Sequence, residues 1–203
     1  MDIVIKDLEK KDYSNAIDFA IQGMHFNRYM DNPSDLRLYG KYFFYMELQH
    51  ATQVIAAYMG DKLVGVLMAK VNQEPKTGCS FLKRIFVCIV NIVMRMGSTK
   101  DASLYDKANE EMFEQYCRTE KTDGEICFLA ADPTIQGKGI GSLLLDELEK
   151  REKGKNIHLY TDNNCTYQFY EHRGFQRRGE KVIEMVLQGK NVPLTCFLYS
   201  KRM

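Results

Sequence analysis

Three glycines alternate with other residues in a stretch that leads into a helix. Gly137, Gly139 and Gly141 are separated by Lys138 and Ile140. Glycine lets the backbone approach a ligand closely and adopt positive φ. The unpaired N–H groups and the positive dipole end of a helix N-terminus attract anions. The pattern therefore predicts a pyrophosphate cradle in which Lys138 supplies a positive charge, although a glycine-rich turn that binds nothing stays open.

The residues on either side of these glycines predict a strand, a turn and a helix. A short apolar run, residues 128–131, ends at Asp132 and Pro133, where the proline cannot donate to a sheet ladder. After Ser142, leucines recur at the 3.6-residue period of an amphipathic helix. The spacing G-x-G-x-G differs from the dinucleotide fingerprint G-x-G-x-x-G. It differs from the P-loop too, because Gly139 separates Lys138 from any Ser or Thr.

Two motifs resemble those of the GNAT N-acetyltransferase superfamily. Residues 136–141, QGKGIG, resemble the Q/R-x-x-G-x-G signature that opens the coenzyme A site of that family. Residues 163–175 resemble its N-x-x-A-x-x-x-Y-E-x-x-G-F block, with Thr166 where alanine is commoner. Both motifs occur in the family's order and at its separation.

The resemblance implies that acetyl-coenzyme A is the acyl donor and that no metal takes part. In the family, the fourth and fifth strands splay apart and leave backbone amides that hold the acetyl and pantetheine groups. Asn163 matches an asparagine that contacts the pantetheine arm or orders the turn, and capping the next helix is its alternative role. The donor-binding residues expected here are Leu129, Ala130, Ala131, Gln136, Gly137, Lys138, Gly139, Ile140, Gly141, Ser142 and Asn163.

Acetyl transfer from a thioester to an amine needs a base for the ammonium, donors for the oxyanion and an acid for the departing thiolate. Tyr170 matches the family tyrosine whose hydroxyl lies near the coenzyme sulfur, so it is the candidate acid. Packing in the core is its alternative role. Glu125 falls where histone-acetylating relatives carry a base glutamate, and strand alternation predicts that Glu125, Cys127 and Leu129 share one face. A merely solvated carboxylate is the alternative for Glu125.

Composition narrows the class of protein. The 203 residues include 28 basic and 27 acidic residues, so electrostatics favour neither a nucleic-acid nor a membrane partner. The first residues lack an apolar signal-peptide core, and the six cysteines lack zinc-ligand spacing. A reduced, cytoplasmic protein is therefore expected.

The order of the predicted elements indicates an α/β fold, as the resemblance also implies. We expect a single acetyltransferase domain over residues 1–203, with a mixed, mostly antiparallel central sheet flanked by helices. A hairpin over residues 53–71 precedes the cofactor strand, and a closing antiparallel pair follows residue 175. The aromatic-rich helix over residues 34–49 either packs in the core or forms one wall of the acceptor cleft.

A helical insertion at about residues 74–120 is expected between the third and fourth strands. Its apolar stripe has three interpretations: burial on the parent domain, a homodimer contact, or a position on a membrane surface. The stripe comprises Phe81, Leu82, Ile85, Phe86, Ile89, Val90, Val93 and Met96. It is too short and too charged for a membrane span.

The expected function is direct transfer of the acetyl group of acetyl-CoA to a primary amine of a small molecule or peptide. Two alternatives remain open from the sequence. One is a non-catalytic module that senses acetyl-CoA, and the other is a scaffold that binds a partner through the insertion. The acceptor itself is not specified by these motifs.

Overall fold

The computed structural model describes residues 2–28, 30, 32–77, 80–96, 100–135, 137–187 and 190–203. Its helices are α1 (Tyr13–Gly23), α2 (Pro33–His50), α3 (Phe81–Met96), α4 (Lys100–Cys117), α5 (Ile140–Arg151) and α6 (Tyr167–His172). Its strands are β1 (Ile3–Lys6), β2 (Gln53–Met59), β3 (Lys62–Val71), β4 (Gly124–Ala131), β5 (Asn156–Asp162), β6 (Gln176–Leu187) and β7 (Lys190–Arg202).

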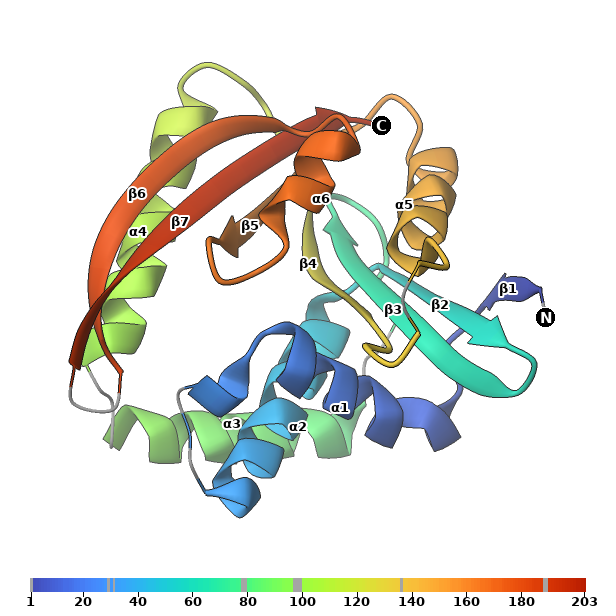
Figure 1. Ribbon diagram of the computed structural model, residues 1–203, viewed down its shortest axis with the longest axis horizontal. Coiled ribbons are helices and arrows are strands. Elements are labelled where there is room, and N and C mark those ends of the chain that lie inside the picture. Colours follow the sequence, from blue (N-terminus) through green and yellow to red (C-terminus); the bar gives the residue numbers. More distant parts are fainter. Residues whose placement is uncertain are drawn as a thin grey trace.

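The strands form one sheet in the order β1-β2-β3-β4-β5-β7-β6, shown in Figure 1. Every neighbouring pair is antiparallel except β4 and β5, which are parallel and are linked by α5. A parallel pair needs such a crossover, whereas a hairpin turn is enough to join antiparallel neighbours, as between β2 and β3 at Gly60, where φ is 62°. The expected mixed, mostly antiparallel sheet is confirmed.

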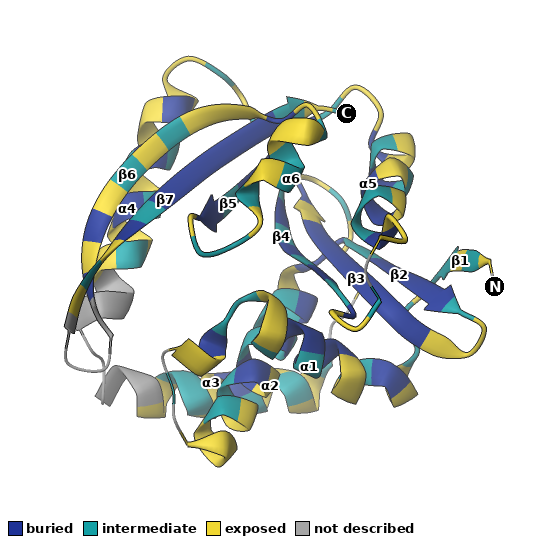
Figure 2. Ribbon diagram, viewed as in Figure 1, coloured by how far each residue is buried: buried dark blue, intermediate teal, exposed yellow. Residues whose placement is uncertain are grey.

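Helices cover both faces of the sheet. On one face, Leu144, Leu145 and Leu148 of α5 are fully buried against the central strands. On the other, α1 and α2 bury Ala16, Ala20 and Phe44 against β2, β3 and β4. Figure 2 shows the buried residues of the central strands between these layers. The side chains at the domain centre thus hold β4 between two packed helical layers.

The expected helical insertion lies between β3 and β4 as two helices. The second, α4, packs on β6 and β7, where Met112 and Tyr116 join a small separate core. The first, α3, packs on α2 and leaves much of its stripe exposed (Figure 2). Five stripe residues are 41–77% exposed: Phe81, Leu82, Ile85, Ile89 and Val93. For these residues, the interpretation that the stripe is buried on the parent domain is wrong.

Among the described residues, no helix has both the length and the apolar composition that a membrane crossing requires.

Candidate active site

Strands β4 and β5 separate soon after they begin. Their register contains two pairs, Gly124 with Ile157 and Glu125 with His158, although β4 continues to Ala131. The rest of β4 stays paired with β3 on its other side. From Cys127 onward, the edge of β4 that faces β5 is therefore open, as the diverging ribbons in Figure 1 illustrate.

The ladder geometry identifies which amides face this opening. The N–H of Asp132 donates to the carbonyl of Val64 on β3 at 2.8 Å. Alternate residues of an antiparallel pair direct their N–H groups to the same neighbour, so Ala130 also faces β3. The N–H groups of Leu129 and Ala131 then face the opening, where β5 offers no ladder partner. Two of the three expected strand amides are thus placed for a ligand, and that of Ala130 is not.

A β-bulge at Cys127 changes which side chains share a face. Met68 pairs with Phe128 and Ala69 with Ile126, so Cys127 is the extra residue of β4. Ile126 packs in the core under α5, whereas Phe128 packs in the core under α1 and α2. The prediction that Leu129 shares a face with Glu125 and Cys127 is wrong, because the bulge interrupts the alternation and Leu129 packs on the α5 side.

The predicted cradle lies at the start of α5. Gly137 and Gly139 have φ of 72° and 65°, in the left-handed region that favours glycine. Gly139 is the N-cap of α5, and no side chain caps its first turn. Ile140 is buried, which fixes the helix start, while Lys138 is exposed and Ser142 is half-buried. Gln136 lies outside the described residues.

Gly141 serves a different purpose from the two glycines before it. A Cβ added there would lie 3.0 Å from Cζ of Phe169, whereas a Cβ at Gly137 or Gly139 would meet nothing within 4 Å. Gly141 therefore permits close packing of α5 on α6. The open space around the other two leaves their backbone accessible to a ligand.

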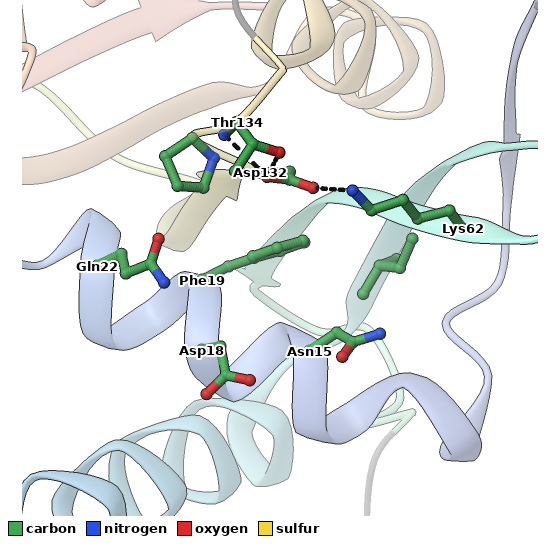
Figure 3. A pocket seen from close by; sticks show the side chains of 9 residues that line it. Asn15, Asp18, Phe19, Gln22, Lys62, Asp132 and Thr134 are labelled. Atoms are coloured by element: carbon green, nitrogen blue, oxygen red, sulfur yellow. Dashed lines mark hydrogen bonds and ion pairs between the residues drawn. The ribbon is translucent and has the colours of Figure 1, made fainter. Parts of the chain in front are cut away.

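A buried aspartate anchors the loop that carries the cradle. Asp132 accepts hydrogen bonds from the N–H and Oγ1 of Thr134, at 2.9 and 2.6 Å, and pairs with Lys62 Nζ at 2.7 Å (Figure 3). Burial alone would raise the pKa of Asp132, but these partners hold it below its ordinary value. The pocket in Figure 3, about 190 Å³, lies between α1 and this loop, and none of residues 137–142 lines it.

A second carboxylate, which the sequence did not single out, faces the opening from α2. Cys127 lies close enough to Glu47 for each to affect the pKa of the other, while the Cys127 thiol donates to the carbonyl of Glu125 at 3.8 Å. Burial, and then the nearby charge of Glu125, raise the pKa of Glu47 to about 7. Burial also raises the pKa of Glu125, while the charge of Lys70 opposes this. Two carboxylates thus lie near each other on the α2 side of the opening.

Residues of β5 and α4 complete this side of the opening. His158, Tyr160 and Asp162 alternate along β5, and the ring of His158 lies 4.9 Å from that of Phe113 on α4. Burial lowers the pKa of His158 to about 4, and its Nδ1 lies 2.8 Å from Thr122 Oγ1. Burial raises the pKa of Tyr160, and the charge of Glu125 adds to the effect. A histidine that is neutral at pH 7 adds no positive charge here.

Tyr170 is placed on the opposite side, in the core under α5 and α6. Its ring lies 5.6 Å from that of Phe175 and 5.3 Å from that of Phe169. Burial raises its pKa, and among the described residues its hydroxyl has no hydrogen-bond partner. The structure therefore keeps this phenol protonated and its hydroxyl uncommitted, which suits a proton donor.

Asn163 ties the end of β5 to β7. Its Oδ1 accepts from the N–H of Thr195, and its own N–H donates to the Thr195 carbonyl, both at 3.0 Å. The N-cap of α6 is Thr166, and no side chain caps that helix. Asn163 consequently orders the turn after β5, and it does not cap the next helix.

The comparisons with known proteins agree with this geometry. A model described as "Acetyltransferase (GNAT) domain" matches residues 103–177, which span α4, β4, the cradle, β5 and α6. This match covers less than half of the chain and lies over the two motifs of the sequence. The resemblance inferred from the two motifs is confirmed.

The individual proteins that this chain resembles match it over a short segment or at low sequence identity. N-alpha-acetyltransferase RimI of Mycobacterium tuberculosis is 39% identical over 64 residues, which are 30% of this chain and 40% of that protein. A Drosophila melanogaster polyamine N-acetyltransferase, described as forming N-acetylagmatine, aligns over 100% of both chains at 14% identity with a TM-score of 0.63. The PaiA N-acetyltransferase of Thermoplasma acidophilum, solved with coenzyme A, aligns over 100% of both chains at 16% identity with a TM-score of 0.51. The last two establish likeness of fold.

Proposed function

We propose that this protein transfers the acetyl group of acetyl-CoA directly to a primary amine that carries positive charge. One observation supports this most: the β4–β5 opening presents free amides near the cradle and carboxylates on the α2 side. A donor and an acceptor that approach from these two sides would meet at the opening. The likeness to amine acetyltransferases supports the reaction class, and the acidic groups support the acceptor class.

The donor side fits a diphosphate and an acyl thioester. The uncapped first turn of α5 and the left-handed Gly137 and Gly139 leave backbone N–H groups available for the diphosphate. The amides of Leu129 and Ala131 face the opening, where a thioester carbonyl would develop negative charge. Acetyl-CoA supplies an activated acetyl group. Gly137 and Gly139 would hold its diphosphate, and the amides of Leu129 and Ala131 would hold its thioester carbonyl.

We assign proton removal to Glu47 and Glu125 acting as a pair. An alkylammonium, with a pKa of about 10.4, must lose a proton before it can attack. Glu47, with a pKa raised to about 7, can accept that proton near neutral pH, and the nearby Glu125 contributes to raising that pKa. Interacting carboxylates titrate together, so the pair is the base.

The bond changes then balance with the residues present. The acceptor ammonium gives one proton to Glu47, the neutral amine nitrogen then bonds to the thioester carbon, and the carbon–sulfur bond breaks. The nitrogen loses its second proton as the amide forms, and this proton replaces, through solvent, the one that Tyr170 gives up. Tyr170 donates its phenolic proton toward the departing sulfur. Because its pKa lies above that of a thiol, this donation must accompany bond cleavage, since transfer to an already formed thiolate would be uphill.

The acceptor side favours a cation. Glu47, Glu125 and Asp162 lie on α2, β4 and the end of β5 around this side, and the charge of Asp162 also acts on Tyr105 of α4. Lys70 is the cation that acts on both Glu47 and Glu125. A small diamine or polyamine matches this charge better than a neutral or anionic amine.

We also propose a cytoplasmic location, on the cysteine usage of the sequence.

The deciding experiment combines binding with turnover. Calorimetry with acetyl-CoA should show one site per chain, and release of free thiol should appear with cationic amines. Binding without turnover across a broad amine panel would instead indicate a sensor of acetyl-CoA. If well-folded protein binds no acetyl-CoA, the proposal is wrong. A separate variant, Asp162→Asn, tests whether the preference among acceptors depends on the carboxylates of the α2 side.

A further inference from the structure

The outward surface of α3 is almost wholly apolar. Among the described residues, eleven large hydrophobic side chains are exposed, and six of them lie on this one helix. They form the α3 outer face, composed of Phe81 (74% exposed), Leu82 (77%), Ile85 (41%), Ile89 (56%), Ile92 (54%) and Val93 (63%). A patch of this kind on one helix normally marks an interaction surface.

The opposite side of α3 is already committed to the domain. Val87 is 8% exposed, and the ring of Phe86 lies 5.7 Å from that of Tyr45 on α2. The hydroxyl of Tyr42 donates to Asn91 Oδ1 at 2.6 Å. Because these contacts fix the helix on α2, the α3 outer face cannot turn inward without breaking them, so only a partner outside the domain could cover it.

The charged residues of the chain segment that contains α3 are all basic, although the ammonium of Lys83 lies over the rings of Tyr13 and Tyr45 on the inner side of the helix. Residues 75–100 contain Lys76, Lys83, Arg84, Arg95 and Lys100 and no acidic residue, although the whole chain has a net charge of only +1. Arg84 is exposed next to Ile85. A second copy packed face to face would bring two such positive segments together, whereas an anionic lipid surface complements them.

We propose that α3 docks this protein on membranes rich in anionic lipid, with the α3 outer face in the boundary between headgroups and acyl chains. Its 16 residues would lie in the plane of the surface, and no described helix is able to cross the bilayer. Apolar burial and attraction of the flanking cations to lipid phosphates both contribute. This surface is distinct from the residues assigned to acetyl transfer, because α3 packs on α2 and supplies none of them.

The absence of tryptophan from the sequence provides a direct test. Ile89→Trp introduces a single reporter in the α3 outer face, and Val182→Trp places a matched reporter at an exposed position of β6 (61% exposed). With vesicles of 70% phosphatidylcholine and 30% phosphatidylserine, the emission of Ile89→Trp should shift to the blue and that of Val182→Trp should not. Vesicles of phosphatidylcholine alone should bind about tenfold more weakly, and 0.5 M salt should reduce the difference.

Sedimentation with the same vesicles supplies the second measurement. The double variant Ile85→Glu/Ile89→Glu should lose about tenfold or more in binding, while Val182→Glu should bind as the unaltered protein does. All these positions are exposed, and unchanged thermal unfolding would verify folding. Absence of binding to the anionic vesicles, or equal shifts from both reporters, would overturn the proposal. A dimer that the glutamate pair dissociates, without vesicle binding, would assign the face to a second copy instead.

Discussion

At the scale of single residues, the two carboxylates of the opening differ in what each should do to the pH profile. If Glu47 is the group that accepts the proton, kcat/KM should fall below about pH 7, where Glu47 becomes protonated. Glu47→Gln should remove this limb and lower kcat by about 10²–10⁴-fold. Glu125→Gln should move the limb to lower pH, because a like charge that raises the pKa of Glu47 is removed. An unchanged limb in both variants would show that neither carboxylate is the base.

The same raised pKa has a consequence for stability. Ionising Glu47 is easier in the unfolded chain, at its ordinary pKa of 4.5, than in the folded protein. Protonation of the Glu47 carboxyl therefore favours the folded state, and the free energy of unfolding falls as the pH rises from 4.5 through about 7. Glu47→Gln should match the unaltered protein at pH 4 and exceed its free energy of unfolding by about 2–3 kcal/mol at pH 9. Urea unfolding at the two pH values measures this, and equal effects at both would contradict it.

Tyr170 and Tyr199 make a matched pair, because their rings pack in one core but their hydroxyls differ. The hydroxyl of Tyr199 donates to Glu171 at 2.7 Å and accepts from Arg177 at 3.0 Å, whereas that of Tyr170 has no partner among the described residues. Tyr170→Phe should lower kcat by about 10²-fold with little effect on unfolding. Tyr199→Phe should cost about 1 kcal/mol of stability and leave kcat nearly unchanged. The reverse pattern, in steady-state kinetics and thermal unfolding, would remove Tyr170 from the mechanism.

At the scale of elements, the cradle depends on backbone shape more than on side chains. Gly139 has φ of 65° and Gly154, in the loop after α5, has φ of 87°, and a Cβ at either would meet nothing within 4 Å. Alanine at either position should therefore cost a similar amount, about 1–2 kcal/mol. Only Gly139→Ala should also weaken acetyl-CoA binding, because it alters the turn that presents the first N–H groups of α5. Equal affinities in calorimetry would show that this turn does not hold the donor.

The elements themselves were largely predictable from the sequence, because their apolar periods and turn residues act locally. The hairpin at Gly60 and the crossover helix α5 follow from such signals. The bulge at Cys127 does not, since it depends on how β3 and β4 pair and leaves no mark in an apolar run. The bulge places Leu129 on the α5 face of the sheet and Cys127 near Glu47 of α2.

Glu47 was missed for a related reason. It lies on α2, a helix rich in aromatic residues, and its burial arises from packing against β4, which is distant in the sequence. A single glutamate near the end of a helix carries no local signal of an altered pKa. The exposure of the α3 stripe could not be predicted from the sequence either, because helical periodicity shows that a helix has an apolar face but not what covers that face.

At the scale of the whole molecule, charge is balanced overall and uneven locally. A net charge of +1 gives little long-range steering of a cationic substrate. The cation preference that we propose would therefore arise near the opening, from Glu47, Glu125 and Asp162. At these short distances and with partial burial, attraction is only weakly screened by salt.

This locality predicts how the acceptor should be selected. 1,4-Diaminobutane and n-butylamine have the same carbon chain, but only the diamine keeps a second ammonium while the first reacts. Its kcat/KM should be about tenfold higher or more, mainly through KM, and the ratio should change little between 50 and 500 mM salt. Asp162→Asn should reduce the ratio, whereas Asp146→Asn, on the exposed side of α5, should not. A ratio near one would mean that the acidic residues recognise no second charge. The acceptor would then have to be selected by shape along α2 and α4.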